Sequence, residues 1–256
     1  MQILYQAVFL ALIISGTFVI KGPDRPGSIG QEQQSWTPPE FEERQDERDQ
    51  MVNYQLKRRG ISDKDVLDAM RNAPRHLLIP KENRAAAYAD RPLPIGYGQT
   101  ISQPYIVGYM TEILDLEEGD KVLEVGTGSG YQASVLAEIT PKVYSIEIIE
   151  ALGKRARNDL KELGYTPIEV KIGDGYYGWE EHAPFDAIIV TAAAGHIPSP
   201  LIDQLKPGGT MVIPLGGPYQ TQNLMKVTKT EDGNMKTKNL MPVRFVPMTG
   251  KVQKGG

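Results

Sequence analysis

The chain has 256 residues, a formal net charge of −4 and 40% hydrophobic residues. This length is enough for one sizeable α/β domain with extensions, and the composition is that of an ordinary soluble globular protein. The acidic balance gives no sign of a nucleic-acid partner held through its phosphates. Because the sequence contains no cysteine, disulfides, thiolate–zinc sites and cysteine nucleophiles are excluded. The three histidines are too scattered along the sequence to predict a metal site.

Residues 1–21 form an apolar leader, since the run from Ile3 to Ile20 contains no charged residue. Its length lies at the lower limit of the ~17–25 residues that a bilayer span needs. No basic residue precedes the run and no clear cleavage site follows it. Lys21 and Arg25 lie on its C-terminal side, which favours a cytoplasmic location for the following domain. An uncleaved anchor, a cleaved signal that exports the domain to the periplasm, and a mis-called start are equal alternatives.

A predicted linker and then a helical segment follow the apolar leader. Residues 22–40 are rich in Gly, Pro, Gln and Ser and predict a disordered linker. The folded domain is expected over 41–250, with a helical part at 41–80. A first helix is expected to end in basic residues before Gly60, and Ser62 is expected to cap a second helix.

Residues 81–120 are expected to form a loop followed by a helix. The stretch from Leu93 to Tyr105 is dense in glycine, proline and hydroxyl side chains, and its two glycines allow a tight loop. Thr100 and Ser102 alternate, so in an extended segment they would face the same way. No histidine is evident as a base for Ser102, which is therefore a better hydrogen-bond donor to an anionic substrate than an acyl-transfer nucleophile. The alternative is an ordered loop with a capping serine.

The remainder of the domain, residues 121–250, alternates strands and helices and predicts an α/β fold with a mostly parallel, doubly wound sheet. Strands are expected at 121–125, 142–147, 168–172, 185–190 and 210–215, and helices at 131–139, 149–163 and 198–205. Pro207–Gly209 predicts a turn before the fifth strand, and 224–229 and 243–246 predict antiparallel strands at one sheet edge. Residues 251–256 are expected to be a disordered tail.

A glycine-rich turn follows the first of these strands, with Gly126, Gly128 and Gly130 spaced as G-x-G-x-G. Strand, glycine turn and helix together open a nucleotide-binding βαβ unit. In a dinucleotide-binding turn the third glycine comes one position later. The shorter spacing is typical of sites for S-adenosylmethionine, which has no pyrophosphate to place at the helix N-terminus. Glu124 in the strand and Thr127 in the turn are included in the predicted cofactor site.

Other candidate ligand groups follow the next strands, whose carboxyl ends should meet at the same sheet edge. Glu147 can accept both hydroxyls of a ribose, and Asp174 can accept an adenine amino group, with Gly175 leaving room for the base. The alternatives are a solvated strand-end acid and a simple Asp-Gly turn. The side chains of Thr191–Ala194 are small. They either allow a substrate to approach closely or only pack a helix against the sheet.

Together these segments resemble the protein-L-isoaspartate (D-aspartate) O-methyltransferases over roughly residues 44–248. The loop from Gly98 to Pro104 is the most specific part of the resemblance. Shorter matches lie at 75–80, 206–209 and 243–247. The resemblance implies a Rossmann-like methyltransferase fold with an N-terminal helical extension. Members of this family usually lack the apolar leader and the linker.

The resemblance implies a repair enzyme. It would move the methyl group of S-adenosylmethionine to the α-carboxylate of L-isoaspartyl and D-aspartyl residues, releasing S-adenosylhomocysteine, and the ester would then collapse to a succinimide that reopens partly to normal aspartate. A catalytic role is implied for Ser102, a lining role for Thr100, Ile101 and Gln103, and a further cofactor contact for Gln222. The expected partners are age-damaged proteins and peptides, with no metal and no nucleic acid. We expect a monomer, with residues 3–20 as a membrane tether in one alternative.

Three other interpretations stay open at this point. The chain could be another S-adenosylmethionine-dependent methyltransferase that acts on a small carboxylic acid or on a different protein site. It could be a cofactor-binding, non-catalytic interaction protein tethered to a membrane, although the intact loop around Ser102 argues against this. A nicotinamide dehydrogenase is disfavoured by the G-x-G-x-G spacing.

Overall fold

The computed structural model describes residues 36–217 and 220–254. The apolar leader, most of the predicted linker and residues 255–256 therefore lie outside the described residues. Trp36–Gly256 form one of the two units into which the chain divides. Among the described residues, no helix is both long enough and apolar enough to span a membrane.

The elements of this unit follow one another as helices first and then as an α/β alternation. The helices are α1 Gln45–Gln50, η1 Met51–Leu56, η2 Lys57–Arg59, α2 Lys64–Asn72, η3 Arg75–Leu78, η4 Lys81–Ala86, α3 Pro104–Leu114, α4 Tyr131–Ala137, α5 Glu150–Glu162, η5 Gly175–Tyr177, η6 Glu180–His182, α6 Ser199–Gln204 and η7 Lys251–Lys254. The strands are β1 Leu93–Gly96, β2 Gln99–Ile101, β3 Lys121–Val125, β4 Lys142–Glu147, β5 Glu169–Ile172, β6 Phe185–Val190, β7 Leu205–Leu215, β8 Gln222–Lys229 and β9 Met235–Val243.

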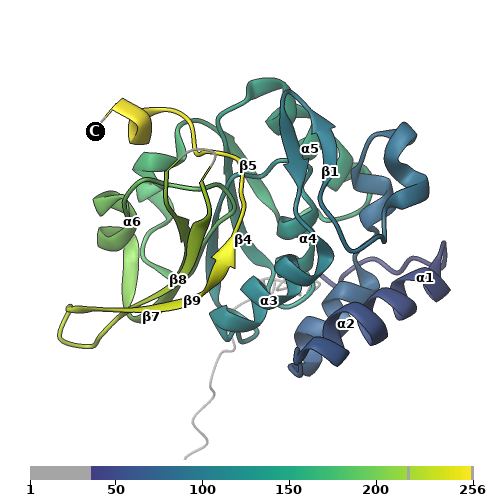
Figure 1. Ribbon diagram of the computed structural model, residues 1–256, viewed down its shortest axis with the longest axis horizontal. Coiled ribbons are helices and arrows are strands. Elements are labelled where there is room, and N and C mark those ends of the chain that lie inside the picture. The colour runs from purple at the N-terminus through teal and green to yellow at the C-terminus, as the bar shows by residue number, and fades with distance from the viewer. Residues whose placement is uncertain (1–35, 218–219, 255–256) are drawn as a thin grey trace, which may run out of the picture. The chain divides into compact units, whose positions relative to one another are not determined.

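A seven-stranded sheet with the order β5-β4-β3-β6-β7-β8-β9 forms the centre of the domain (Figure 1). The pairs among β5, β4, β3, β6 and β7 are parallel, whereas β8 and β9 are antiparallel to their neighbours. This arrangement confirms the predicted α/β fold class and the predicted antiparallel edge. The predicted strands at 121–125, 142–147 and 185–190 coincide with β3, β4 and β6.

Two predictions for the later strands are wrong. The last strand was expected at 243–246, but β9 runs over Met235–Val243. Residues 236–239 in the middle of β9 are all polar and exposed, because it is the edge strand, so β9 lacks the apolar alternation that marks a half-buried strand. The expected turn at Pro207–Gly209 lies inside β7, where the register changes between the pairs Phe185–Leu205 and Ala187–Thr210. The segment is thus a bulge in a longer strand.

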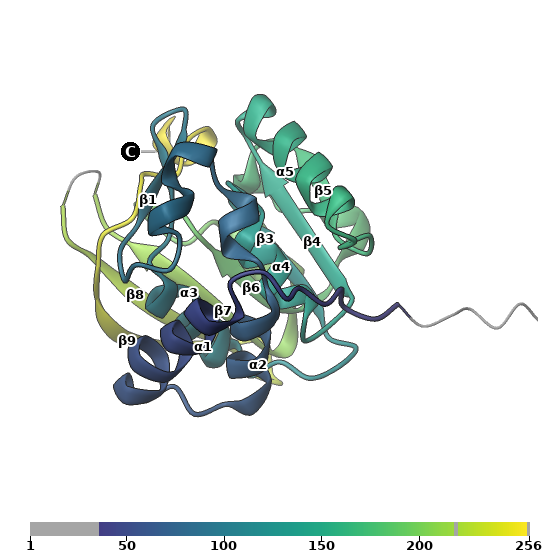
Figure 2. The same cartoon turned by 90° about the vertical axis from the view of Figure 1, so that its right-hand side faces the viewer.

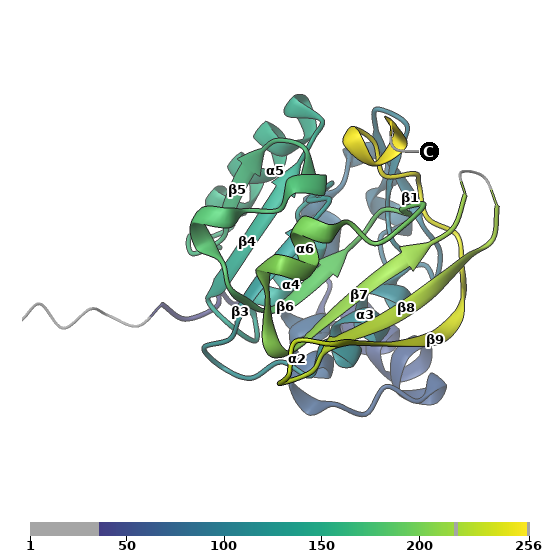
Figure 3. The same ribbon diagram turned by 90° about the vertical axis from the view of Figure 1, so that its left-hand side faces the viewer.

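Each face of the sheet has its own apolar core. Successive residues of one strand point to opposite faces, so Ile189 packs in the core on one face and Ile188 in the core on the other. Helices α1, α2 and α3 gather on the first face (Figure 2). Helix α6, with Leu201 fully buried, covers the other face (Figure 3). The sheet is therefore covered on both faces, which leaves the carboxyl ends of its parallel strands as the place for a site.

The N-terminal helices differ from the prediction in one detail. The first helical segment ends at Gly60, whose φ of 97° fits the expected glycine end. The second helix, α2, is capped by Asp63 and not by Ser62. The Asp63 carboxylate accepts from the backbone N–H groups of Asp65 at 2.8 Å and Val66 at 3.0 Å. Serine and aspartate both cap helices well, but Ser62 lies one position too early in the chain to reach these donors.

The two ends of the described chain are more ordered than the sequence predicted. The Trp36 indole donates to the carbonyl of Gly164 at 3.0 Å, although residue 36 falls in the predicted linker. Lys251–Lys254 form a short 3-10 helix in which Val252 is buried, where a disordered tail was expected. In both places one apolar side chain finds a partner on the domain surface, which composition alone does not reveal.

Candidate active site

A narrow cavity of about 70 Å³ lies at the carboxyl ends of β3, β4, β5 and β6. Its lining includes Gly126 and Gly128 of the glycine turn, Glu147 at the end of β4, Gly175 after β5 and Thr191 after β6. These residues come from all four strand ends that the sequence singled out. The structure therefore brings four of the nine predicted cofactor residues, Gly126, Gly128, Glu147 and Gly175, to the lining of one cavity.

The glycine turn borders this cavity with residues that have no side chain. Gly126 and Gly128 have φ angles of 104° and 55°, a region that L-residues rarely adopt. A Cβ on Gly126 would also collide with Oγ1 of Thr191, and one on Gly175 would collide with Val125.

Gly130, the third glycine of the turn, has a different role, since a Cβ there would come within 3.1 Å of Leu160 on α5. The third glycine thus packs the start of α4 closely against α5.

Glu147 fixes the turn while facing the cavity. Its Oε2 accepts from the N–H of Gly128 at 2.8 Å, and its Oε1 accepts from the N–H of Ile149 at 2.9 Å. A carboxylate has about four acceptor positions, so these two bonds leave capacity for the paired hydroxyls of a ribose. The side chain is only 5% exposed, so a ligand hydroxyl would meet it in a partly dehydrated setting.

Glu124 in β3 and Thr127 in the turn itself are buried and do not line the narrow cavity. The Ser145 hydroxyl donates to Glu124 Oε2, and Oγ1 of Thr127 lies 2.5 Å from Oγ of Ser145. Burial raises the pKa of the Glu124 carboxyl to about 8, so the group is mostly protonated at neutral pH. The predicted direct cofactor contact is therefore replaced by a buried polar chain that supports the turn from the strand side.

Asp174 is tied to the C-terminal segment. Its Oδ1 accepts from the N–H of Tyr176 at 3.0 Å and its Oδ2 from the N–H of Lys251 at 2.7 Å. The neighbouring Gly175 lines the narrow cavity, as the sequence predicted. Asp174 itself does not line this cavity. Its contact with Lys251 could not be read from the sequence, because Asp174 and Lys251 are far apart in the chain.

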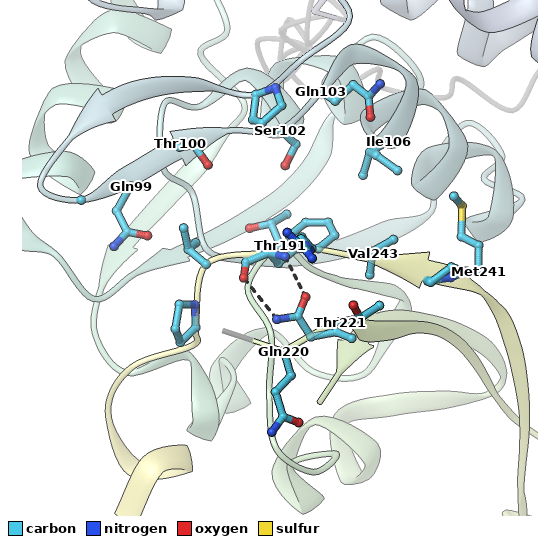
Figure 4. A pocket seen from close by; sticks show the side chains of 18 of the residues that line it. Gln99, Thr100, Ser102, Gln103, Ile106, Thr191, Gln220, Thr221, Met241 and Val243 are labelled. Carbon is cyan, nitrogen blue, oxygen red and sulfur yellow. Dashed lines mark hydrogen bonds between the residues drawn. The ribbon is translucent and has the colours of Figure 1, made fainter. Parts of the chain in front are cut away.

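A second, larger cavity of about 960 Å³ adjoins the first. Thr100, Ser102 and Gln103 from the β1–β2 hairpin and its exit form one wall, and Gln220, Thr221, Met241 and Val243 lie opposite (Figure 4). Thr100 and Ser102, which were expected to face the same way, both line this cavity, together with Gln99 and Gln103. Ile101 between them is only 5% exposed and packs in the core, so its predicted lining role does not fit its position.

The two cavities share part of their lining. The shared residues are Gln99, Thr100, Thr191, Val246, Pro247 and Thr249. A ligand group in the narrow cavity and a second one in the large cavity would therefore meet between the hairpin and the segment 246–249. The sequence reasoning assigned no role to this segment, although its first residues belong to one of the stretches that carried the family resemblance.

Arg75 holds the loop that carries Ser102. Its guanidinium is fully buried and donates through Nη2 to the carbonyl of Ser102 at 2.7 Å and through Nε to the carbonyl of Ala87 at 2.7 Å. Burial lowers the pKa of this group to about 10, which still leaves it charged at neutral pH. The sequence reasoning assigned this residue no role, although it begins one of the stretches that carried the family resemblance.

Gln222 uses its side-chain amide within the protein, and its cofactor contact stays a prediction. Its amide oxygen accepts from the N–H of Phe245 at 2.8 Å and its amide nitrogen donates to the carbonyl of Phe245 at 3.4 Å. The side chain is 1% exposed and lines the large cavity, not the narrow one. Both ends of the amide are used to hold the segment after β9 in place.

A family model for protein-L-isoaspartate(D-aspartate) O-methyltransferase matches residues 46–253. The chain belongs to this family. It is 62% identical over 185 residues to protein-L-isoaspartate O-methyltransferase 2 of Syntrophobacter fumaroxidans, covering 72% of this chain and 75% of the relative. It is 53% identical over 199 residues to the Gloeobacter violaceus protein-L-isoaspartate O-methyltransferase, covering 78% of this chain and 97% of the relative. The family resemblance inferred from the sequence is thus confirmed.

Solved structures agree with this membership. One protein-L-isoaspartate O-methyltransferase structure matches with a TM-score of 0.72 and 28% identity, covering 80% of this chain and 67% of that chain. A Plasmodium falciparum structure assigned to the same enzyme class, and solved in complex with S-adenosyl-L-homocysteine, matches with a TM-score of 0.68 and 28% identity over 78% of this chain and 97% of that chain. The Rossmann-like methyltransferase fold is confirmed.

Proposed function

We propose that the described domain moves the methyl group of S-adenosylmethionine to the α-carboxylate of L-isoaspartyl and D-aspartyl residues in damaged proteins. The observation that carries this proposal is the junction of the two cavities. Thr100 and Thr191 border both the narrow cavity under the glycine turn and the large cavity that contains Ser102. A methyl donor and a carboxylate would be held face to face there, and family membership supplies the identity of both.

The narrow cavity offers groups that suit the ribose end of S-adenosylmethionine. Its volume of about 70 Å³ lies below the ~300–1,000 Å³ of pockets that hold drug-sized ligands, so the rest of the cofactor would extend into the adjoining large cavity. Two glycines keep side chains out of it, at positions where a Cβ would collide with Thr191 and Val125. Glu147 offers acceptors for the ribose hydroxyls, and its charge disfavours a 2′-phosphate. When bound, S-adenosylmethionine supplies an electrophilic methyl group on a sulfonium. We propose that Gly126, Gly128, Glu147 and Gly175 contact it directly, whereas Glu124, Thr127 and Gly130 hold the turn.

The acceptor side of the site suits an anionic substrate that needs no activation. A carboxylate is already ionised at neutral pH, so no general base is required. The remaining task is to hold the two groups aligned. A strongly cationic clamp would reduce the nucleophilicity of the carboxylate, because charge is neutralised as the reaction proceeds. We propose that the Ser102 hydroxyl and amides of its loop orient the carboxylate as neutral donors, with Thr100 and Gln103 lining its approach.

The biological outcome proposed for this transfer is repair. The methyl ester of an isoaspartyl residue is a better electrophile than the free carboxylate, so the neighbouring backbone nitrogen can attack its carbonyl carbon and close a succinimide with loss of methanol. Opening of that ring returns part of the chain to normal aspartate. The cytoplasmic location of the domain, its monomeric state, its division into a helical part and an α/β core, and the tether role of residues 3–20 stay predictions from the sequence.

The repair itself can be followed by chromatography. A peptide with an isoaspartyl linkage is incubated with the enzyme and S-adenosylmethionine, and its conversion to the separately synthesised aspartyl peptide is measured over several cycles. We expect the aspartyl peptide to accumulate only when both the cofactor and the enzyme are present. An isoaspartyl peptide that stays unchanged while S-adenosylhomocysteine still binds would show that the substrate assignment is wrong.

A further inference from the structure

The charge of the large cavity is opposite to that of the whole protein. The chain carries a formal net charge of −4. Among the described residues that line this cavity, the ionisable side chains are two arginines, Arg59 and Arg244, and no acidic side chain is present. A cation-lined cavity in an acidic protein favours ligands that carry negative charge at matching positions.

Arg59 is held in place before any substrate binds. It stands at the end of η2, next to the glycine that ends this helical segment. Its guanidinium lies 3.4 Å from the centre of the Tyr105 ring, and Nη1 forms an ion pair with Asp90 Oδ2 at 2.9 Å, which offsets part of its charge. Tyr105 in turn stacks on Tyr109 with ring centres 5.8 Å apart. A guanidinium has five N–H donors, so a fixed Arg59 keeps donors for a ligand at a reduced cost in side-chain entropy.

Arg244 comes from the other side of the cavity, directly after β9. Its backbone position is fixed by its neighbours, since Phe245 is bound through both backbone groups to the buried amide of Gln222. Its side chain is exposed, and among the described residues it takes part in none of the ion pairs. The charge of Arg244 is therefore available to a ligand that enters the large cavity.

Neither arginine borders the narrow cavity. The reacting carboxylate has to reach the junction of the two cavities, where the shared residues lie, so the arginines are placed for other parts of the substrate. The size of the large cavity agrees with this. At about 960 Å³ it lies near the upper end of the ~300–1,000 Å³ found for pockets that hold drug-sized ligands, which leaves room for residues beside the modified one.

We propose that the large cavity selects isoaspartyl peptides with acidic residues next to the damaged site, and that Arg59 and Arg244 bind those flanking carboxylates. This proposal rests on the proposed function. It assigns two different tasks to the polar groups of the cavity. Neutral donors near the junction orient the reacting carboxylate without weakening it as a nucleophile, and the two cations farther out set the sequence preference.

The test uses the full chain and three isoaspartyl peptides that differ only in their flanking residues, which are Glu, Gln or Lys. We expect kcat/KM to fall in that order by about three- to fivefold per step at low ionic strength, the range for partly exposed ion pairs. The differences should appear in KM and not in kcat, and they should shrink above about 0.5 M salt, where exposed charges are screened.

Charge-neutralising variants then locate the preference. Arg59→Gln and Arg244→Gln should each reduce the Glu-to-Lys ratio of kcat/KM by about three- to fivefold. Two matched controls remove the same charge outside the cavity and should leave the ratio unchanged. They are Arg58→Gln, next to Arg59 with its guanidinium over the Tyr54 ring, and Lys238→Gln on the exposed edge strand β9. If Arg59→Gln folds poorly, Arg59→Lys is measured as well. It keeps the charge and should preserve most of the preference for Glu.

The outcomes separate this proposal from the function on which it rests. Equal kcat/KM for the three peptides, a preference for Lys, or control variants that act as strongly as the cavity variants would overturn the proposed selection. In each of these cases the isoaspartyl peptides would still be methylated. Methylation of none of the three would overturn the proposed function itself, and the selection with it.

Discussion

The guanidinium Nη2 of Arg75 lies 2.7 Å from the carbonyl oxygen of Ser102. This contact joins two parts of the chain that are 27 residues apart. A second donor of the same group binds the carbonyl of Ala87 at 2.7 Å, so one buried cation fixes the chain before and after the β1–β2 hairpin. Because hydrogen bonds from charged donors are stronger than neutral ones, Arg75 acts as a positioning residue for the loop that carries Ser102.

Replacing Arg75 with Gln should lower kcat by about tenfold or more, since a hydrogen bond to a charged group contributes roughly 1.5–3 kcal/mol. The buried position also predicts a lower melting temperature. The assay is therefore run well below the melting temperature of the variant, with the affinity for S-adenosylhomocysteine measured by calorimetry. Cofactor affinity should stay within about threefold, and Arg75→Lys should recover part of kcat. The same change at Arg71, a surface residue paired with Asp49 and Asp68, serves as the control. A kcat for Arg75→Gln equal to that of the wild type would contradict the positioning role.

Removing the hydroxyl of Ser102 should affect turnover more than binding of the cofactor. Ser102 lines the large cavity but not the narrow one. Ser102→Ala is expected to lower kcat about ten- to hundredfold, the loss of one hydrogen bond to an ionised group, while the Kd for S-adenosylhomocysteine changes less than about twofold. Single-turnover rates and calorimetry give the two values. An equal loss of cofactor affinity and turnover would mean that Ser102 belongs to the cofactor site.

Glu147 should show the reverse pattern. Its carboxylate holds the N–H groups of Gly128 and Ile149 and faces the narrow cavity. In Glu147→Gln one oxygen acceptor is replaced by an amide donor, so the turn loses a bond and the ribose loses acceptors. We expect a Kd for S-adenosylhomocysteine at least about tenfold higher. Glu150→Gln, on the exposed start of α5, is the matched control. An unchanged Kd in Glu147→Gln would rule out the ribose contact.

Glu124 makes the stability of the domain depend on pH. Burial raises the pKa of its carboxyl from 4.5 to about 8 in the folded protein. The folded state therefore binds a proton more tightly than the unfolded state. The stability linked to this group is fully present below pH 4.5 and is lost as the pH rises through about 8. Glu124→Gln mimics the protonated form, so its free energy of unfolding should fall less over this range.

Thermal unfolding between pH 5 and 9 measures the difference, and the wild type should lose several degrees more than Glu124→Gln. The comparison between the two proteins isolates this group, because Glu138, whose pKa burial raises to about 6, titrates in both. Parallel curves for the two proteins would show that Glu124 is ionised in the fold.

The sequence predicts those parts of the molecule whose signals are local. Strands β3, β4 and β6 are buried apolar runs, so their bounds agree with the expected ones. Strand β9 was misplaced because an exposed edge strand carries polar side chains without alternation. The choice between Ser62 and Asp63 as the cap of α2 depends on a shift of one residue, which composition cannot resolve.

In the site, too, the residues with a local sequence signal were predicted, and the long-range contacts were not. Gly126, Gly128, Glu147 and Gly175 follow strands of a recognisable pattern, so the topology of the sheet brings them together as predicted. The contact of Gln222 with Phe245, which lies 23 residues further along the chain, could not be read from the sequence. Glu124 was taken for a ligand contact, although its side chain points beneath the turn to Ser145. These roles depend on which long-range neighbour each side chain meets, and a single sequence does not contain that information.

The central claim is that the domain methylates the α-carboxylate of isoaspartyl residues. It is tested most directly with two peptides of identical sequence, one with an isoaspartyl linkage and one with normal aspartate at the same site, and S-adenosylmethionine labelled in its methyl group. We expect a base-labile methyl ester on the isoaspartyl peptide alone, formed much more slowly by Ser102→Ala. Label on both peptides, or on neither while S-adenosylhomocysteine still binds in the narrow cavity, would contradict it.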